Sequence, residues 1–180
     1  MSRPPRDKKA GVFHAVTHSI RDEALFRSDR DRVHFLRELA RAKARSGWTC
    51  VVYCLMTTHY HVILAVEDEA LPRGMHRLNF RYASWFNSEY GFRGHVMAAR
   101  YWSRRINDNA DLLGTYRYVV MNPVRAKECT SPIDWPWSSY AGTAGLRPAD
   151  DFVDPTLVLG CFDGPLELRR ADLRRYVEGS

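Results

Sequence analysis

The sequence lacks the features that mark several classes of protein. Its four cysteines form no Cys-x-x-Cys pair, so neither a zinc knuckle nor a dithiol redox motif is indicated. No stretch approaches the ~18 consecutive apolar residues of a membrane-spanning helix, and no uninterrupted apolar segment of a secretory signal follows the basic start of the chain. Internal repeats and low-complexity tracts are also lacking. We therefore expect a cytoplasmic protein with reduced cysteines and no membrane partner.

The residues that are present favour one globular domain with a basic surface. Apolar residues make up 45% of the chain and aromatic residues 12%, which is enough for a packed core. A length of 180 residues fits one domain better than two, since a domain takes ~150 residues. The net charge of +6 suits a polyanionic partner, most simply nucleic acid. A basic protein without such a partner would carry the same charge, so this observation is only supporting.

Apolar periodicity and capping residues predict four strands and four helices. The predicted strands cover residues 11–20, 48–56, 62–66 with the preceding His59 and His61, and 96–106. The predicted helices begin after Ser28, at Leu71, after Asp108 and at Leu166, and they end at Gly47, Gly91, Asn122-Pro123 and Val177. This order predicts an α+β fold, a ferredoxin-like antiparallel sheet flanked by helices that pack on one of its faces.

Composition divides the chain into three parts. Residues 1–10 are rich in Arg, Lys and Pro and are interpreted as a mobile basic arm. Residues 11–145 contain the predicted sheet with its helices and form the main domain. Residues 146–180 form a C-terminal extension with an amphipathic helix, which packs on the main domain or continues it.

Two histidines, His59 and His61, stand at the start of the third predicted strand. Side chains alternate between the two faces of a strand, so both imidazoles point the same way. Two imidazoles on one rigid face are half of a metal site. A lone His-x-His is more often a pair of polar residues on a solvated face, so the metal interpretation depends on a second motif.

The second motif lies on the predicted helix that follows Asp108. Its apolar stripe consists of Leu112, Leu113, Tyr116, Val119 and Val120, so Tyr116 is expected in the core. Tyr118 is two residues further on, about 200° around the helix. The polar face that results holds Asp111, Thr115, Tyr118 and Asn122. A tyrosine hydroxyl can act as a nucleophile, and an amide oxygen at i+4 can complete a metal shell begun by two histidines. Taken alone, a surface tyrosine beside a helix-terminal asparagine is ordinary.

These residue types together suit the cleavage of a phosphodiester. Mg²⁺ or Mn²⁺ held by His59, His61 and Asn122 can polarise the phosphate and help Tyr118 to lose its proton. That help matters because a free tyrosine has a pKa of about 10. Attack by Tyr118 would form a covalent phosphotyrosine, which stores the bond energy for a later joining step.

An arginine-rich stretch over residues 96–106 is the candidate DNA-binding segment. It contains Arg100, Arg104 and Arg105, with Tyr101 and Trp102 between them. Arginines interleaved with aromatic rings can bind phosphates and stack on bases. An edge strand that is protected from aggregation by its charges would have a similar sequence.

The motifs along residues 11–145 resemble those of the REP-associated tyrosine transposases, which are single-tyrosine HUH transposases. HUH stands for histidine, hydrophobic residue, histidine, here His59-Tyr60-His61. The other matching segments are Gly11 to Thr17, Leu25-Phe26-Arg27, Tyr53 to Met56, Arg73 to Asn79, Gly94-His95, Arg117 to Ala126 and Pro136 to Tyr140. Each segment is weak evidence alone, but their order and spacing together are specific.

The resemblance implies a ferredoxin-like sheet with the two histidines on a central strand, the nucleophile at Tyr118 and a metal-side role for Asn122. It implies a single-stranded DNA substrate, often a hairpin from an imperfect palindrome, and a nucleoid-associated location. Cleavage in such enzymes leaves a 5′-phosphotyrosine and a free 3′-hydroxyl. Thr57-Thr58 stands where the family has Pro-Asn, which changes the turn and leaves both histidines in place.

Two alternatives to a metal-dependent DNA strand transferase remain. A domesticated hairpin-binding protein could share the sequence pattern and no longer cut DNA, although a pure binder needs none of His59, His61, Tyr118 and Asn122. The other alternative is a histidine-triad or two-histidine phosphoesterase. A third alternate histidine would stand at position 63, where this chain has isoleucine, and no second His-x-Thr or His-x-Ser pair follows downstream. The sequence leaves open whether the protein is a monomer or a homodimer.

Overall fold

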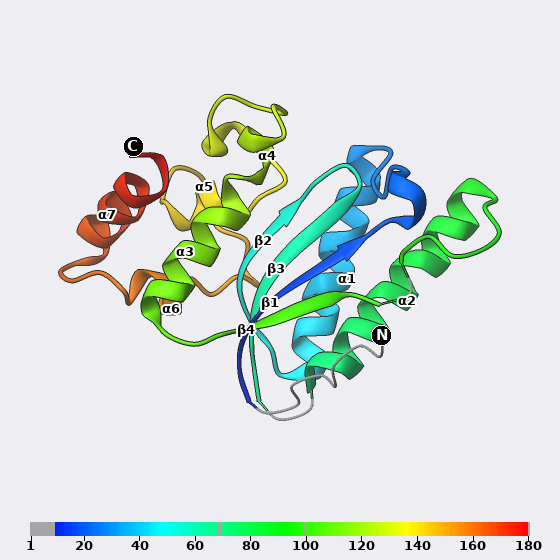
Figure 1. Ribbon diagram of the computed structural model, residues 1–180, viewed down its shortest axis with the longest axis horizontal. Helices are drawn as coiled ribbons and strands as arrows, with labels where there is room; N and C mark the ends of the chain where they lie inside the picture. The colour runs from blue at the N-terminus through cyan, green and yellow to red at the C-terminus, as the bar shows by residue number, and fades with distance from the viewer. Residues whose placement is uncertain (1–9, 68–69, 99, 180) are drawn as a thin grey trace, which may run out of the picture.

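The centre of the molecule is a four-stranded antiparallel sheet, shown in Figure 1; the computed structural model describes residues 10–67, 70–98 and 100–179. Its strands are β1 (Gly11–His18), β2 (Thr49–Leu55), β3 (His59–Val66) and β4 (Trp102–Ile106), in the order β2-β3-β1-β4. β1 lies between β3 and β4 and pairs with both. This is the arrangement of a ferredoxin-like sheet, so the predicted fold class is confirmed.

Helices cover both faces of this sheet (Figure 1). α1 (Asp29–Ser46) and α2 (Ala70–Tyr90) pack together on one face, and α3 (Asn109–Val120) lies on the other. The remaining helical segments are α4 (Asn122–Arg125), α5 (Tyr140–Thr143), α6 (Thr156–Leu159) and α7 (Leu166–Glu178), with 3-10 turns η1 (Ile20–Asp22) and η2 (Pro132–Asp134). α6 and α7 pack against α3, so the residues after position 146 extend the second layer.

Side-chain alternation along the strands builds one apolar core on each face. Phe13, Ala15 and Leu64 pack beneath α1 and α2, whereas Ile63 packs with Tyr116 on the α3 side. The prediction that the helices share one face was therefore wrong. The reason is the burial of β2, which is complete at every position from 50 to 55. A strand that is buried on both faces needs helices or other elements packed against both.

Capping residues set the helix boundaries as the sequence predicted. The Ser28 side chain accepts a hydrogen bond from the Asp31 backbone N–H, and the Asp31 carboxylate accepts one from the Ser28 backbone N–H, which completes a capping box before α1. Gly47 ends α1 in the left-handed conformation, with φ at 64°. Asp108 caps α3 by accepting from the Asp111 N–H at 2.8 Å. These local signals fix where α1 and α3 begin.

Three boundaries differ from the prediction by two residues or more. β1 ends at His18 rather than at Ile20. β4 begins only at Trp102, so Arg100 precedes the strand; the chain before it makes an isolated bridge between Met97 and Ser19. α3 ends at Val120, as its approach to Pro123 requires, but the chain then enters α4 with that proline in its first turn, where a missing N–H is tolerated. The predicted basic arm, residues 1–10, lies outside the described residues except for Ala10.

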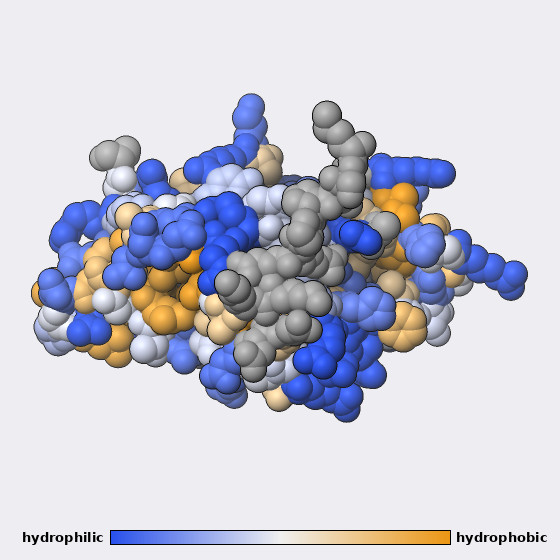
Figure 2. Space-filling view, turned by 60° about the horizontal axis from the view of Figure 1, so that its bottom comes forward, coloured by the Kyte–Doolittle hydropathy of each residue, from blue (hydrophilic) through white to orange (hydrophobic). Residues whose placement is uncertain are grey.

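The face of the molecule drawn in Figure 2 is mainly hydrophilic. In Figure 2 apolar residues gather on the left, the side of the C-terminal helices. Within α6 and α7, the exposed large apolar side chains are Leu157, Leu166 and Leu168, with Tyr176. Hydrophilic residues gather over the end of the molecule at which α1 finishes and α2 begins. Among the described residues, no helix is both long and apolar enough to cross a membrane.

Candidate active site

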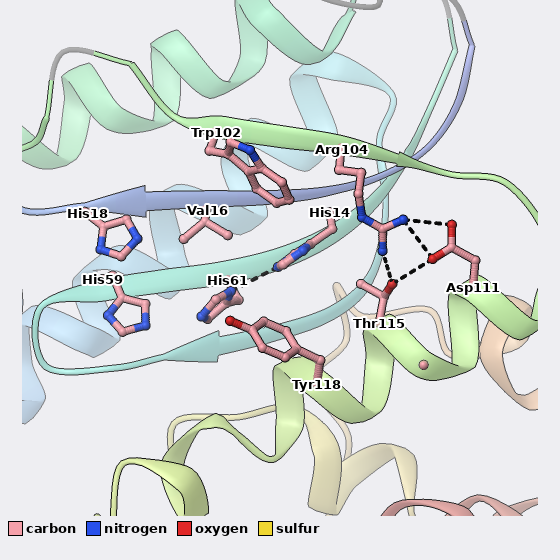
Figure 3. Close-up of a pocket in the computed structure, with 11 residues that line it drawn as sticks. His14, Val16, His18, His59, His61, Trp102, Arg104, Asp111, Thr115 and Tyr118 are labelled. Carbon is pink, nitrogen blue, oxygen red and sulfur yellow. Dashed lines mark hydrogen bonds and ion pairs between the residues drawn. The ribbon is translucent and has the colours of Figure 1, made fainter.

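A pocket of about 520 Å³ lies between the sheet and α3, with side chains from three strands facing the helix (Figure 3). β1, β3 and β4 supply its floor and α3 supplies its wall. The side chains and backbone that line it belong to His14, Val16, His18, His59, His61, Trp102, Arg104, Asp111, Gly114, Thr115 and Tyr118. It thus brings together residues that are up to 104 positions apart in the sequence, from His14 to Tyr118.

Four of the lining residues are histidines, and strand pairing sets their positions. His59 and His61 share a face of β3, with their ring centroids 4.9 Å apart. His18 is paired with His59 across β1 and β3, and these two rings stack at 4.7 Å. His14 Nε2 lies 3.0 Å from His61 Nδ1. The predicted orientation of His59 and His61 toward one side is therefore confirmed, and β1 adds two further imidazoles.

Burial keeps the inner pair of histidines neutral. Burial, together with the positive charge of Arg104, lowers the pKa of His14 to about 4. Burial and the neighbouring histidines lower the pKa of His61 to about 2. A neutral imidazole has one nitrogen with a free lone pair, which is the form that binds a metal ion. At neutral pH both rings are in that form.

The orphaned nitrogen of His61 fits a metal ligand. Its Nε2 is buried and has no hydrogen-bond partner, while its Nδ1 is occupied by His14. A buried polar atom without a partner is costly unless something else satisfies it. Across the three described ranges of the chain, no group of three or more His, Cys, Asp or Glu side chains could hold a metal ion. Any ion bound by His59 and His61 would therefore need amide, hydroxyl, phosphate or water oxygens as well.

Tyr118 reaches into the same pocket from α3. Its ring centroid lies 5.7 Å from that of His61 and 6.0 Å from that of His14, and in Figure 3 its hydroxyl points toward His61. Tyr118 is 45% exposed, whereas Tyr116 is fully buried, so the predicted phase of the helix is confirmed. The Arg125 guanidinium lies 5.0 Å from the centre of the Tyr118 ring, a cation–π contact that places positive charge beside the phenol.

Asn122 lies outside the residues that line the pocket. Its amide nitrogen donates to the Tyr118 backbone oxygen at 2.7 Å, which caps the end of α3. The metal-side role of Asn122 stays a prediction.

The four predicted DNA-binding residues separate onto different surfaces. Alternation along β4 turns Trp102 and Arg104 into the pocket, with the Trp102 ring at 5.5 Å from that of His14. Arg105 points to the opposite face, where its guanidinium lies 4.9 Å from the centre of the Phe13 ring. Arg100 lines a separate groove beside α2. The sequence stretch therefore supplies two pocket residues, and the other two do not join them.

Arg104 is held in the pocket by α3. Its Nη1 donates to both carboxylate oxygens of Asp111 at 2.8 Å, and its Nη2 donates to the Thr115 hydroxyl at 2.6 Å (Figure 3). Because two different nitrogens of the guanidinium are bound, one by Asp111 and one by Thr115, its plane is fixed. The link also joins β4 to the helix that carries Tyr118.

His14 and His18 are pocket residues that the sequence alone did not assign to the site. Both lie in the first predicted strand, where the i, i+4 spacing places their side chains on one face. What the sequence did not contain was the register of β1 against β3, which sets His18 opposite His59. Arg125 was visible only within a family motif, and its contact with Tyr118 depends on the turn into α4.

Comparisons with known proteins agree with this fold. No family model matches the sequence, and no curated protein matches it. A solved structure of a REP-associated tyrosine transposase bound to a REP hairpin superposes with a TM-score of 0.69 at 18% identity, over 86% of this chain and 94% of that chain. A crystal structure assigned as a transposase from Deinococcus radiodurans R1 gives a TM-score of 0.47 at 13% identity, over 66% of this chain and 95% of that chain. The first of these superpositions shows that the chain has the fold of a REP-associated tyrosine transposase, as its motifs predicted.

Proposed function

We propose that the protein is a metal-dependent single-stranded DNA endonuclease and strand transferase that acts on hairpin DNA through a covalent 5′-phosphotyrosine. The observation that carries this proposal is the placement of the half-exposed Tyr118 hydroxyl beside two strand histidines, one with an orphaned nitrogen, in a single pocket. A fold shared with a transposase that is bound to a REP hairpin supports the same class of substrate.

His59 and His61 are the residues that would hold a divalent cation, Mg²⁺ or Mn²⁺, with oxygen ligands completing its shell. The neutral state of His61 and its unpartnered Nε2 fit this role. When bound, such a cation supplies charge neutralisation at the scissile phosphate and favours the ionised form of the attacking phenol.

Tyr118 performs the covalent step. Its Oη forms a bond to phosphorus while the bond between phosphorus and the 3′ oxygen breaks. The phenol proton passes to water, which reaches this half-exposed side chain, and the departing 3′ oxygen takes up a proton to become a hydroxyl. Joining is the reverse reaction, in which a different 3′-hydroxyl attacks the phosphotyrosine and Tyr118 is released.

Trp102 and Arg104 position the strand. Trp102 is 53% exposed at the pocket, so its ring is available for stacking with an unpaired base. Arg104, a β4 residue on the pocket floor, is held by Asp111 and Thr115 and would bind a phosphate oxygen of the strand. An unpaired strand fits such a pocket because its bases are free to stack.

The test is covalent capture. The protein is incubated with a single-stranded hairpin oligonucleotide and Mn²⁺, and the products are separated on a denaturing gel. Because the proposed bond joins Tyr118 to a 5′ phosphate, a 3′-labelled oligonucleotide should leave its label on the protein, and a 5′-labelled one should give a free, shortened fragment. Label on the protein from the 5′ end would contradict the proposed polarity.

A catalytically silent hairpin-binding protein is the competing outcome. It would bind the hairpin with the same salt dependence, yet form no adduct with any label, with or without Mn²⁺. Adduct formation that disappears with EDTA and returns with Mn²⁺ would exclude it.

A further inference from the structure

A second charged cleft lies between α1 and α2, on the sheet face opposite the histidine–tyrosine pocket. Its volume is about 290 Å³. The residues that line it are Glu38, Arg41, Ala42, Arg45, Arg77, Leu78 and Arg81. Each helix contributes two arginines one turn apart, so four guanidinium groups surround one carboxylate. We call this feature the arginine cleft.

Glu38 holds two of the four arginines in place. Its side chain is 2% exposed and accepts hydrogen bonds from Arg41 Nη1, at 2.6 Å, and from Arg81 Nε. Burial raises the pKa of Glu38, but the hydrogen bonds from Arg81 and Arg41 outweigh it and hold this pKa below its ordinary value. The side chains of Arg41 and Arg81 are 60% and 47% exposed, so each guanidinium keeps N–H groups that face solvent and can bind a ligand.

Arg45 and Arg77 are the uncompensated charges of the cleft. Both are exposed, and within the described part of the chain neither makes an ion pair or a hydrogen bond. Two unpaired guanidinium groups beside two oriented ones create a positive potential that a single buried carboxylate does not cancel. The cleft is therefore suited to an anion with several charged oxygens.

The lining also shows what the cleft does not recognise. It has no aromatic ring and no amide, so it offers neither a surface for base stacking nor a group that reads base edges in both donor and acceptor roles. Guanidinium groups bind phosphate oxygens, which carry no sequence information. A duplex presents such a backbone with its bases turned inward.

We propose that the arginine cleft binds the phosphate backbone of duplex DNA without reading its sequence. The choice of DNA as the partner rests on the proposed function. The arginine cleft itself takes no part in the chemistry of the pocket. Because the two sites lie on opposite faces of the sheet, a ligand in one leaves the other accessible.

The test compares two double variants that lose the same charge. Arg45→Ala with Arg77→Ala empties the cleft of its unpaired arginines and leaves Glu38 with both of its partners. Arg37→Ala with Arg175→Ala removes two exposed helical arginines that do not line the cleft. Binding of a blunt duplex is measured over a series of salt concentrations, for two unrelated sequences, after thermal unfolding has confirmed that both variants are folded.

In the cleft variant, the slope of log Kd against log salt should fall by about 2, because two phosphate contacts and their released counterions are lost. The loss should be equal for both duplex sequences, and the control variant should keep the wild-type slope. Equal slopes in the two variants would overturn the proposal, as would a loss confined to one sequence. Cleft-dependent binding of poly-glutamate without any change in duplex binding would assign the cleft to an acidic protein instead.

A second readout separates this inference from the proposed function. Adduct formation on the hairpin oligonucleotide, measured at a DNA concentration that saturates both proteins, should proceed in the cleft variant as in the wild type, since the pocket is untouched. A wild-type protein that forms no adduct, yet shows the cleft-dependent duplex slope, would contradict the proposed function and support the arginine cleft.

Discussion

His14 Nε2 and His61 Nδ1 lie 3.0 Å apart across the paired strands β1 and β3, and both rings are buried. If His61 is to present a free lone pair on Nε2, its proton must be on Nδ1, and His14 is then the acceptor. A hydrogen bond of this kind fixes the tautomer and the ring orientation of a metal-binding histidine. His14 is therefore a positioning residue, whose effect should be seen in metal affinity.

The first prediction concerns His14. His14→Phe removes the acceptor and should weaken Mn²⁺ binding about 10- to 100-fold, the usual effect of losing such a partner. His14→Gln should restore part of the affinity, because its amide oxygen can accept the same hydrogen bond. Isothermal titration with Mn²⁺ measures both. Unchanged affinity in His14→Phe would show that the contact has no part in ordering His61.

The second prediction separates the two proposed ligands by stability. His59→Ala and His61→Ala should each abolish Mn²⁺-dependent cleavage. His61→Ala should also lower the free energy of unfolding by about 1–3 kcal/mol, because it leaves buried His14 without its partner. His59 is only half-buried, so its variant should lose less. Urea denaturation of the metal-free proteins provides the measurement, and cleavage that survives either change would remove that histidine from the site.

The third prediction concerns the nucleophile. Tyr118→Phe removes one oxygen from a half-exposed ring, so stability should change by less than about 0.5 kcal/mol. The covalent DNA adduct should disappear, because a phenyl ring cannot attack phosphorus. DNA binding should persist, since phosphate contacts come from other residues.

Tyr116→Phe is the matched control on the same helix. Its hydroxyl belongs to the buried side of α3, so the adduct should form as in the wild type. Mass spectrometry of the trapped complex should place the nucleotide remnant on the peptide that contains Tyr118. An adduct that needs Tyr116 and not Tyr118 would overturn the assignment of the nucleophile.

The fourth prediction uses two neighbouring arginines of β4 that face opposite ways. Arg104→Ala should weaken binding of an unstructured single strand, because its side chain lines the pocket. Arg105→Ala removes the same charge from the other face and should change this affinity less. Asp111→Ala should release Arg104 from its fixed orientation, and cleavage should fall more than binding does. Fluorescence anisotropy at one salt concentration compares binding by all three variants, and the Mn²⁺-dependent cleavage assay measures the activity of Asp111→Ala. Equal losses of affinity in the two arginine variants would place the strand elsewhere.

The sequence by itself determined much of this protein. Capping at Ser28 and Asp108, the apolar stripe through Tyr116 and the alternation of His59 and His61 are local properties, and each depends on residues within a turn or two of one another. These patterns predicted the α+β class and the separate environments of Tyr116 and Tyr118. The family motifs added the fold, which the structural comparison confirms.

Only the tertiary structure decided which residues from these separate segments come into contact. Whether His14 contacts His61 depends on the register of β1 against β3, and a shift by one residue would turn either ring to the other face. Whether Arg104 or Arg105 enters the pocket depends on how β4 pairs with β1. The burial of β2 on both faces required the second helical layer, which brings Tyr118 to the histidines. Alternation along a strand specifies which residues share a face, but contacts between distant strands and helices decide which face becomes the site.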